Sequence, residues 1–259
     1  MARSVLTNRR PLLAVDAPIL LHRAHHRGRN AIQGSVLELA SIIAIHKPRA
    51  VAICMGLGAA VYRVSQHPDY HAKRPPKPRS LERSFEGAPD VYQRLGWSIY
   101  TSTTLEADDL VFSLAKAEAA AGGRTLIVTG DKDLYGAVSS KTRLIFLGPT
   151  RIPNLIGPHE VMTRYGIAPY QVPDYIALAG DRSDGIPGAH RVGAKGASSL
   201  LRAHGTLERV IQRTPKLQTQ APQLHLYKQI ATLQTVSLSL PPSRQTDWKQ
   251  GNAFLGLGS

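Results

Sequence analysis

Short runs of consecutive apolar residues recur in the first 150 positions, separated by segments whose apolar residues lie three or four positions apart. Such short runs are typical of strands buried on both faces, and the wider spacing is typical of helices. Strands are expected within 11–16, 50–55, 97–101, 125–129 and 144–147, and the main helices between them over 31–46 and 106–121. This alternation predicts an α/β fold around a central, mostly parallel sheet.

The pattern changes after residue 150. Helical spacing predicts further helices over 158–165, 172–179 and 197–204, and a Gly-rich turn region over 181–195 separates the last two. Residues 214–259 are polar and rich in Gln, and they predict no particular element. We therefore expect an α/β domain over residues 1–150 and a helical region with a C-terminal tail over 151–259.

The chain is strongly basic, with 32 Lys and Arg against 18 Asp and Glu and a net charge of +14. This balance favours a polyanionic partner, most commonly nucleic acid. Residues 56–89 predict a basic segment with some helix, in which only Asp69 and Glu82 oppose the basic residues of 63–83. Those basic residues are Arg63, Lys73, Arg74, Lys77, Arg79 and Arg83. They indicate salt-dependent capture of phosphate, although a solvated basic loop has the same composition.

Several classes of protein are excluded or disfavoured by composition. The single cysteine, Cys54, excludes an internal disulfide and a cysteine-based zinc site, and we expect it to be a buried apolar residue. No apolar run approaches the length that spans a membrane, and the basic N-terminus is not followed by an export signal. A cytoplasmic, nucleoid-associated protein without a membrane partner is expected. Trp97 and Trp248 are interpreted as packing residues.

Acidic residues are scarce, yet eight of the 18 fall in four tight groups. The groups are Asp16; Glu106, Asp108 and Asp109; Asp131 and Asp133; and Asp181 and Asp184. The first and third directly follow apolar strands, and parallel sheets bind ligands at the carboxyl ends of their strands. Each group alone has an ordinary explanation, as a helix start, a turn or a cap. Together they predict carboxylates that converge in one pocket.

Convergent carboxylates repel one another unless a cation compensates their charge. Magnesium prefers hard oxygen ligands and usually keeps several waters. Two such ions about 4 Å apart can bind the attacking and the leaving oxygen of a phosphodiester, and one ion lowers the pKa of a bound water. The sequence therefore predicts hydrolysis of phosphodiesters with Mg²⁺ or Mn²⁺ at two or more sites. A zinc site at His22, His25 and His26 is less favoured than a basic surface loop, because no second histidine cluster has ligand spacing.

From residue 12 to about residue 241 the chain resembles the 5′-nuclease family, which includes the 5′–3′ exonuclease domain of bacterial DNA polymerase I, phage 5′ exonucleases and flap endonucleases. The segments that carry the resemblance are LLAVDAPILLHRAHH (12–26), YHAKRPPKP (70–78), LEADDLVFSLA (105–115), TGDKDLYGAV (129–138), DYIALAGDRSDGIPG (174–188), IPGAHRVGAKGA (186–197) and LYKQIATLQTVSLSLP (226–241). The resemblance implies a PIN-like fold, a basic helical arch at about 63–90 and a helix–hairpin–helix motif at 186–204. Because no polymerase segment follows, we expect a stand-alone, monomeric nuclease.

The resemblance also implies roles for individual residues. Asp16, Glu106 and Asp108 would bind the catalytic metal, with Asp109, Asp131, Asp133, Asp181 and Asp184 around a second one. Arg23 and Arg74 would steady the phosphate beside Asp108 during catalysis. The remaining DNA contacts are assigned to Arg63, Tyr70 and Lys73 in the arch and to Gly188, Arg191, Gly193 and Lys195 in the hairpin, where the family implies a potassium ion.

The sequence departs from the family pattern at three positions. Gly56 stands where the family has a metal-binding Asp at the end of the second strand, Arg191 replaces a hairpin glycine, and His71 replaces an arch lysine. If the missing carboxylate limits the reaction, Gly56→Asp is expected to raise activity.

The sequence thus predicts a structure-specific 5′ nuclease, a flap endonuclease or 5′–3′ exonuclease of DNA replication and repair, acting on DNA with 5′ ends or 5′ flaps. The alternative is a catalytically weakened paralogue that mainly binds branched DNA. A phosphatase with an Asp nucleophile would need Asp-x-Asp after the first strand, which Asp16-Ala-Pro lacks. A compact acid-site ribonuclease fits the basic segment and the hairpin less well.

Overall fold

Six strands form one sheet in the computed structural model, which describes residues 10–148 and 153–243. Their order is β3-β2-β1-β4-β5-β6, and all neighbours pair in parallel except β5 and β6. The strands are β1 (Leu12–Asp16), β2 (Ala50–Leu57), β3 (Ser98–Glu106), β4 (Thr125–Thr129), β5 (Thr142–Phe146) and β6 (Asn154–Ile156). The predicted α/β fold with a mostly parallel sheet is confirmed, and the sequence pattern missed only the short antiparallel β6.

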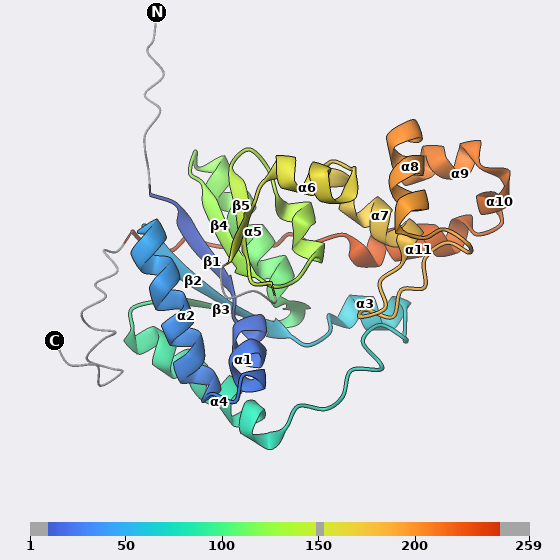
Figure 1. Cartoon of the computed structure of the whole chain (residues 1–259). Helices are drawn as coiled ribbons and strands as arrows, with labels where there is room; N and C mark the ends of the chain where they lie inside the picture. Colours follow the sequence, from blue (N-terminus) through green and yellow to red (C-terminus); the bar gives the residue numbers. More distant parts are fainter. Residues whose placement is uncertain (1–9, 149–152, 244–259) are drawn as a thin grey trace, which may run out of the picture.

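Helices cover both faces of this sheet (Figure 1). Successive β1 residues point to opposite faces, so Leu13 and Val15 pack with α1 (Ala17–His26), α2 (Ala31–His46) and α4 (Arg79–Arg94). Leu12 and Ala14 pack on the other face, with α5 (Ala107–Ala120). Because β1 is buried on both faces, its sequence is an unbroken apolar run that ends at Asp16.

The helical part extends the core on the α5 side of the sheet. Its elements are α6 (Pro158–Tyr165), η2 (Pro169–Gln171), α7 (Val172–Ala179), α8 (Ala194–His204), α9 (Leu207–Arg213), α10 (Pro215–Gln218) and α11 (Ala221–Ala231). The short helix η1 (Asp133–Ala137), which follows β4 in the sheet domain, packs against η2 and α7. The α7 helix packs against α11 and α8. None of the helices described is long and apolar enough to cross a membrane.

After α11 the chain returns to the sheet as a non-helical strap, residues 232–243, which Figure 1 shows passing behind the strands. Polar contacts hold it along its length. The Gln234 and Val236 amides donate to the Asp109 carboxylate (2.8 Å) and the Ser113 hydroxyl (3.0 Å). Further along, Tyr100 donates to the Ser239 carbonyl at 2.8 Å. The strap therefore fastens the helical part to α5 and β3.

One prediction of an element needs correction, because the histidines of 22–26 lie on helix α1 and not on a loop. The helix expected within the basic segment is present as α3 (Val61–Gln66) and most of α4. Trp97 packs beside Tyr92 and Cys54 is buried, so both packing predictions are confirmed. The domain boundary expected at residue 150, Trp248 and the tail after 243 lie outside the described residues.

Candidate active site

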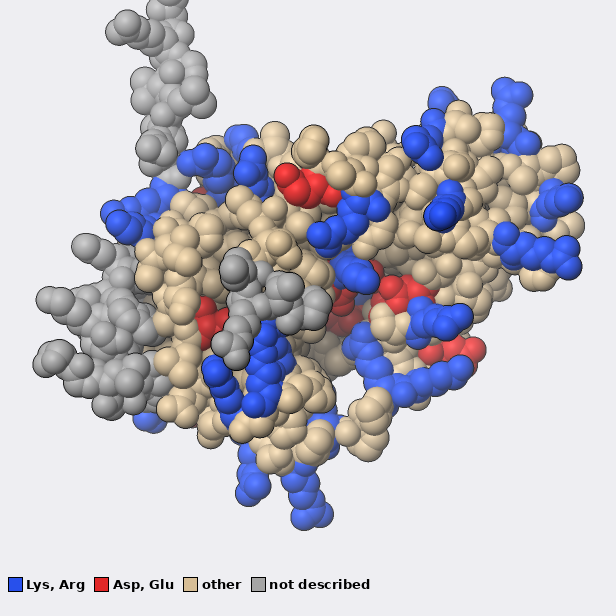
Figure 2. All heavy atoms as spheres, in the orientation of Figure 1, with Lys and Arg blue, Asp and Glu red and all other residues tan. Residues whose placement is uncertain are grey.

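Acidic side chains line one pocket where the strands of the sheet end. Figure 2 shows acidic atoms gathered in a hollow between the sheet and the helical part, with Lys and Arg on the surrounding surface. The acidic residues that line the pocket are Asp16, Glu106, Asp108, Asp131, Asp133 and Asp184. They come from four distant stretches of sequence, and the fold brings them together as the strand ends predicted.

Asp16 and the Asp131 turn are held by one hydroxyl. Asp16 is the last residue of β1, and its carboxylate accepts a 2.8 Å hydrogen bond from Thr129 Oγ1, at the end of neighbouring β4. The same Thr129 oxygen accepts from the Asp131 amide (2.9 Å), and Asp131 Oδ1 accepts from the Asp133 amide (2.9 Å). This turn directs both carboxylates into the pocket. Sequence analysis gave Thr129 no role, although it directly precedes Gly130-Asp131.

The junction between β3 and α5 supplies the second group of acids. Glu106 ends β3, and Asp108 lies in the first turn of α5, where the helix dipole favours negative charge. The Glu106 carboxylate accepts from the Ala60 amide at 3.0 Å and from the Tyr70 hydroxyl at 3.2 Å. The start of the helix therefore presents Asp108 to the pocket and anchors Glu106 at its wall.

The loop after α7 brings Asp184 into the pocket beside Asp133. Asp184 Oδ1 accepts from Arg74 Nη2 (3.2 Å) and lies 3.0 Å from His71 Nε2. The His71 ring stacks on Tyr70, and its Nδ1 lies 2.8 Å from the Gly58 carbonyl. His71 thus touches a pocket carboxylate, which sequence analysis did not foresee. Asp181 instead accepts from the Ser183 amide (2.7 Å) in its own turn and does not line the pocket.

Burial and mutual repulsion make four of these carboxyl groups hard to ionise. Burial, with the Asp131 charge, raises the pKa of Asp16 to about 7 although Thr129 donates a hydrogen bond to it. Burial and neighbouring carboxylates also raise the pKa of Asp108 and Asp133 well above the usual range, and that of Asp131 in the same direction. Asp184 differs, because contacts with His71 and Arg74 outweigh burial and lower its pKa.

This donor set fits hard divalent cations, because magnesium prefers carboxylate oxygens and water molecules as ligands. Among the described residues, no three Asp, Glu, His or Cys side chains are arranged as a ready ligand set for one ion. Magnesium commonly binds through one or two carboxylates and several waters, so the pocket suits such an ion without a closed protein cage.

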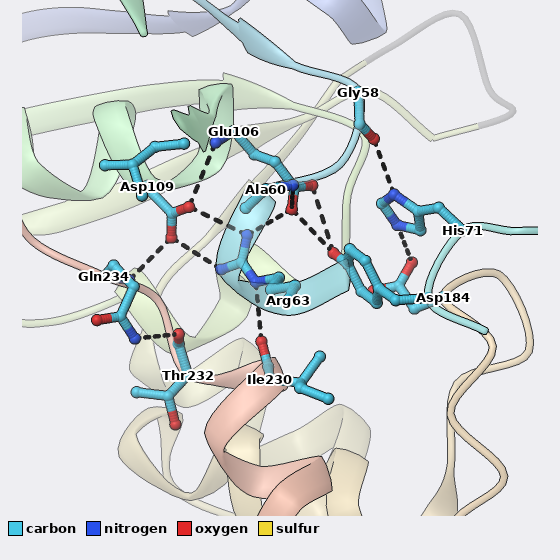
Figure 3. A network of polar contacts seen from close by, with 12 residues as sticks. Gly58, Ala60, Arg63, His71, Glu106, Asp109, Asp184, Ile230, Thr232 and Gln234 are labelled. Atoms are coloured by element: carbon cyan, nitrogen blue, oxygen red, sulfur yellow. Dashed lines mark hydrogen bonds and ion pairs between the residues drawn. The ribbon is translucent and has the colours of Figure 1, made fainter. Parts of the chain in front are cut away.

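Two of the sequence-predicted site residues have a different role. Arg63, assigned to DNA, is only 3% exposed, and Asp109, assigned to a metal, is fully buried. Their side chains pair with each other through two parallel contacts, of 3.0 Å and 2.8 Å (Figure 3). Asp109 does not line the pocket, whereas Arg63 lines it with every guanidinium nitrogen already paired to a protein acceptor. The structure thus gives both residues a mutual pairing, and their assignments to DNA and to a metal stay predictions.

The other predicted DNA contacts are placed in three different settings. Lys73 and Arg74 are exposed in residues 67–78, a non-helical link between α3 and α4, whereas Tyr70 is buried under His71. The predicted arch is therefore helical only at its two ends. Arg23 does not line the pocket; its Nη1 donates to the Leu147 and Gly148 carbonyls (3.0 and 2.6 Å), and its contact with phosphate stays a prediction.

Gly56 shows why the expected second-strand acid is missing. A Cβ at this position would lie 2.4–2.5 Å from backbone atoms of Leu105, Glu106 and Ala107. The β2–β3 register shifts between Met55 and Leu57, which brings Leu57 beside Glu106. No side chain fits there without moving β3, so we expect Gly56→Asp to disturb the junction of β3 and α5.

The predicted hairpin lies between α7 and α8. Arg191, which replaces a glycine of the family, adopts a left-handed φ of +61° and is exposed. Gly188 also has a positive φ, and a Cβ there would lie 2.5 Å from the Gly180 amide nitrogen. Gly193 caps α8, and exposed Lys195 lies in its first turn. This surface presents a helix N-terminus and two cations, and its contact with DNA stays a prediction.

Comparison with known proteins identifies relatives of both halves of the chain. Residues 11–166 match the family model of the N-terminal resolvase-like domain of 5′–3′ exonucleases, and residues 167–250 match its C-terminal SAM-fold partner. DNA polymerase I of Mycobacterium bovis is 30% identical over 184 residues, which are 70% of this chain and 20% of the polymerase. The 5′–3′ exonuclease of Aquifex aeolicus is 28% identical over 193 residues, 74% of this chain and 66% of that protein.

Among solved structures, a complex of the bacteriophage T5 flap endonuclease with DNA and metal ions has a TM-score of 0.71 at 20% identity. The match covers 86% of this chain and 88% of the phage enzyme. The chain spans about a fifth of the length of the polymerase relative, which places the match in one part of a longer protein. Fold, pocket and the match over residues 11–166 agree, and the chain belongs to the 5′–3′ exonuclease family.

Proposed function

We propose that this protein is a structure-specific 5′ nuclease that hydrolyses phosphodiesters of DNA carrying 5′ ends or 5′ flaps, with Mg²⁺ or Mn²⁺ as cofactor. The observation that carries the proposal is the set of four buried carboxyl groups with raised pKa that share one pocket in a basic protein. The T5 flap endonuclease of similar fold, solved with DNA and metal ions, supports it.

Each part of the pocket has a role in this reaction. Asp16, Asp108, Asp131 and Asp133 would hold the cations. When bound, divalent ions activate water and neutralise charge on the phosphate. Arg74 is exposed at the rim and partly paired with Asp184, so it can reach a phosphate that enters the pocket. The hairpin beside α8 would bind duplex phosphates through backbone amides, in the presence of K⁺.

A weakened, mainly DNA-binding paralogue is the second candidate. Two observations favour it: the second strand ends without an acid, and the described side chains form no ready ligand set. Against it, four carboxylates that repel one another are costly to keep unless they bind a cation. Cleavage by the protein decides between the two candidates.

The test is cleavage of a 5′-flapped duplex labelled at its 5′ end, in Mg²⁺, in Mn²⁺ and in EDTA. We expect cleavage with either ion and none in EDTA. Asp108→Ala and Asp131→Ala are each expected to lower the rate at least about 100-fold, because both remove a cation ligand. Binding of the flap in Ca²⁺ should stay within a few-fold of the parent.

Asp90→Ala is the matched control, since Asp90 is an exposed acid of α4 outside the pocket. It should cleave at the parental rate. Binding of the flap without cleavage in any metal would identify the weakened paralogue. Parental cleavage rates for both pocket variants would refute the proposed site.

A further inference from the structure

Arg63 lines the pocket, yet all of its guanidinium nitrogens are already paired with acceptors of the protein itself. We propose that Arg63 is a positioning residue for the hydrolytic reaction: it fixes the Glu106 carboxylate so that one oxygen faces the cation site. The inference rests on the proposed function, because it adds Glu106 to the carboxylates that would hold the cations.

All three guanidinium nitrogens of Arg63 have acceptors (Figure 3). Nη1 donates to Glu106 Oε1 at 2.6 Å and to Asp109 Oδ2 at 3.0 Å. Nη2 donates to Asp109 Oδ1 at 2.8 Å, and Nε donates to the Ile230 carbonyl at 2.9 Å. The planar fork of arginine suits this arrangement, and a lysine ammonium cannot reproduce it.

The hydrogen bonds divide the two oxygens of Glu106 unequally. Oε1 accepts from Arg63, from the Ala60 amide (3.0 Å) and from the Tyr70 hydroxyl (3.2 Å). Among the hydrogen bonds of the described residues, Oε2 takes part in one, a 3.3 Å contact with the same Tyr70 hydroxyl. Oε1 is therefore saturated, and Oε2 keeps the lone pairs that a cation or its bound water needs.

Asp109 holds Arg63 in place through two contacts with its guanidinium. It is fully buried, and besides Arg63 it accepts from the Glu106 amide (3.4 Å) and the Gln234 amide (2.8 Å). Although burial alone lowers the pKa of Arg63, the charges of Glu106 and Asp109 raise it, so the guanidinium stays charged. One buried cation thus offsets two carboxylates at the start of α5.

The same arginine joins the pocket to the helical part. The Ile230 carbonyl lies in the last turn of α11, and the Gln234 amide lies at the start of the strap. The α11 helix packs against α7, and the loop after α7 carries Asp184 into the pocket. Arg63 therefore fixes Glu106 relative to the elements that carry Asp184 into the site.

The test compares Arg63→Lys with the parent, because lysine keeps the charge and loses the fork. Mn²⁺ affinity is measured by electron paramagnetic resonance, the Mg²⁺ dependence of flap cleavage gives kcat and the half-saturating Mg²⁺ concentration, and flap binding is measured in Ca²⁺. We expect Mn²⁺ affinity to fall about 10-fold or more, as for other residues that orient metal ligands. Half-saturating Mg²⁺ should rise by a similar factor, with flap affinity within about two-fold of the parent.

Arg49→Lys is the matched control, because Arg49 pairs with Glu118 by the same kind of fork on the far side of α5. It should leave Mn²⁺ affinity unchanged. If Arg63→Lys does not fold, the double variant Arg63→Gln/Asp109→Asn removes both charges and takes its place, with the same expected loss. Parental Mn²⁺ affinity and Mg²⁺ dependence in the folded variant would overturn the inference.

The failure of the inference can be told from the failure of the proposed function. If the parent binds Mn²⁺ but cleaves no flap, the proposed function fails, and a weaker Mn²⁺ affinity of Arg63→Lys still supports the positioning role. If the parent cleaves and the variant matches it in every readout, only the positioning role fails.

Discussion

At the scale of single residues, Asp16 links the pocket to the pH dependence of stability. Its pKa in the folded state is about 7, raised by burial, against an ordinary value of 3.8. The folded protein therefore holds this proton more tightly than the unfolded chain between about pH 4 and pH 7. The contribution of Asp16 to the stability of the metal-free protein should thus rise as pH falls through that window. Above about pH 7 the buried Asp16 carboxylate is ionised, and its destabilising effect is at its full size.

Asp16→Asn should remove this penalty. In EDTA at pH 8 we expect the free energy of unfolding to exceed that of the parent by about 2–4 kcal/mol, and the difference to shrink toward zero near pH 4. Urea denaturation at several pH values measures it, with Asp90→Asn as the exposed control. A difference that stays constant with pH, or grows as pH falls, would contradict the role assigned to Asp16 burial.

Gly56 gives a second prediction at this scale. Because a Cβ would meet backbone atoms at 2.4–2.5 Å, Gly56→Ala should lower the free energy of unfolding by about 1–3 kcal/mol or more. Gly58→Ala is the control, since only the end of the Lys77 side chain lies near its Cβ position, at 3.8 Å. Equal free energies of unfolding of the two variants, measured in urea, would contradict this prediction, because they would show that the backbone of β3 can move away from a Cβ at position 56 at little cost.

The neighbours Asp108 and Asp109 show what spacing can and cannot predict. The strand ends correctly placed Asp16, Asp131 and Asp133 around one pocket, and Asp108 joins them because β3 continues to Glu106. Spacing did not reveal that Asp109 turns inward to Arg63, since that pairing depends on α3 and α11, whose bounds the sequence pattern did not predict. The crowding at Gly56 was hidden for a similar reason: it follows from a register shift between strands.

At the scale of elements, the hairpin before α8 combines backbone strain with charge. Arg191 occupies a left-handed conformation, which costs a residue other than glycine about 1–2 kcal/mol of stability. Glycine avoids this cost, but it loses more conformational entropy on folding, which offsets part of the gain. Arg191→Gly should therefore raise the free energy of unfolding by about 0.5–1 kcal/mol.

The same substitution tests the proposed phosphate contact. Removal of one phosphate-binding cation lowers the slope of log affinity against log salt by about one. Titration of a duplex at several salt concentrations should show this change for Arg191→Gly and not for Arg94→Ala, an exposed arginine at the far end of α4. An unchanged slope would remove Arg191 from the DNA surface.

Elements with a clean pattern were predicted well, and those with mixed signals were not. Strands β1, β2, β4 and β5 and helices α2 and α5 follow apolar runs or regular helical spacing, whereas β3, expected over 97–101, continues through polar residues to Glu106. Helix α4 buries Leu81, Ala88 and Tyr92, but its many charges and an internal Pro89 obscured that face. Helix α11 was hidden in a Gln-rich stretch, because it forms by packing against α7 and not from its own pattern.

At the scale of the whole molecule, the sheet and the helical part share one hydrophobic core, and the strap ties them together a second time. Asp184 comes from the helical part, whereas Asp16, Asp108, Asp131 and Asp133 come from the sheet domain. The pocket is therefore complete only when both parts are packed together. The chain has a net charge of +14, and Lys and Arg side chains lie on the surface around the acidic pocket, so the protein as a whole would attract a polyanion.

The most direct test of this account is a crystal structure of the protein soaked with Mn²⁺, with the ion located by its anomalous scattering. The account predicts at least one Mn²⁺ peak in the pocket, within direct or water-mediated reach of Asp16 or Asp108 and of Asp131 or Asp133. Mn²⁺ peaks found only elsewhere on the protein, with these four carboxylates free of the ion, would contradict it.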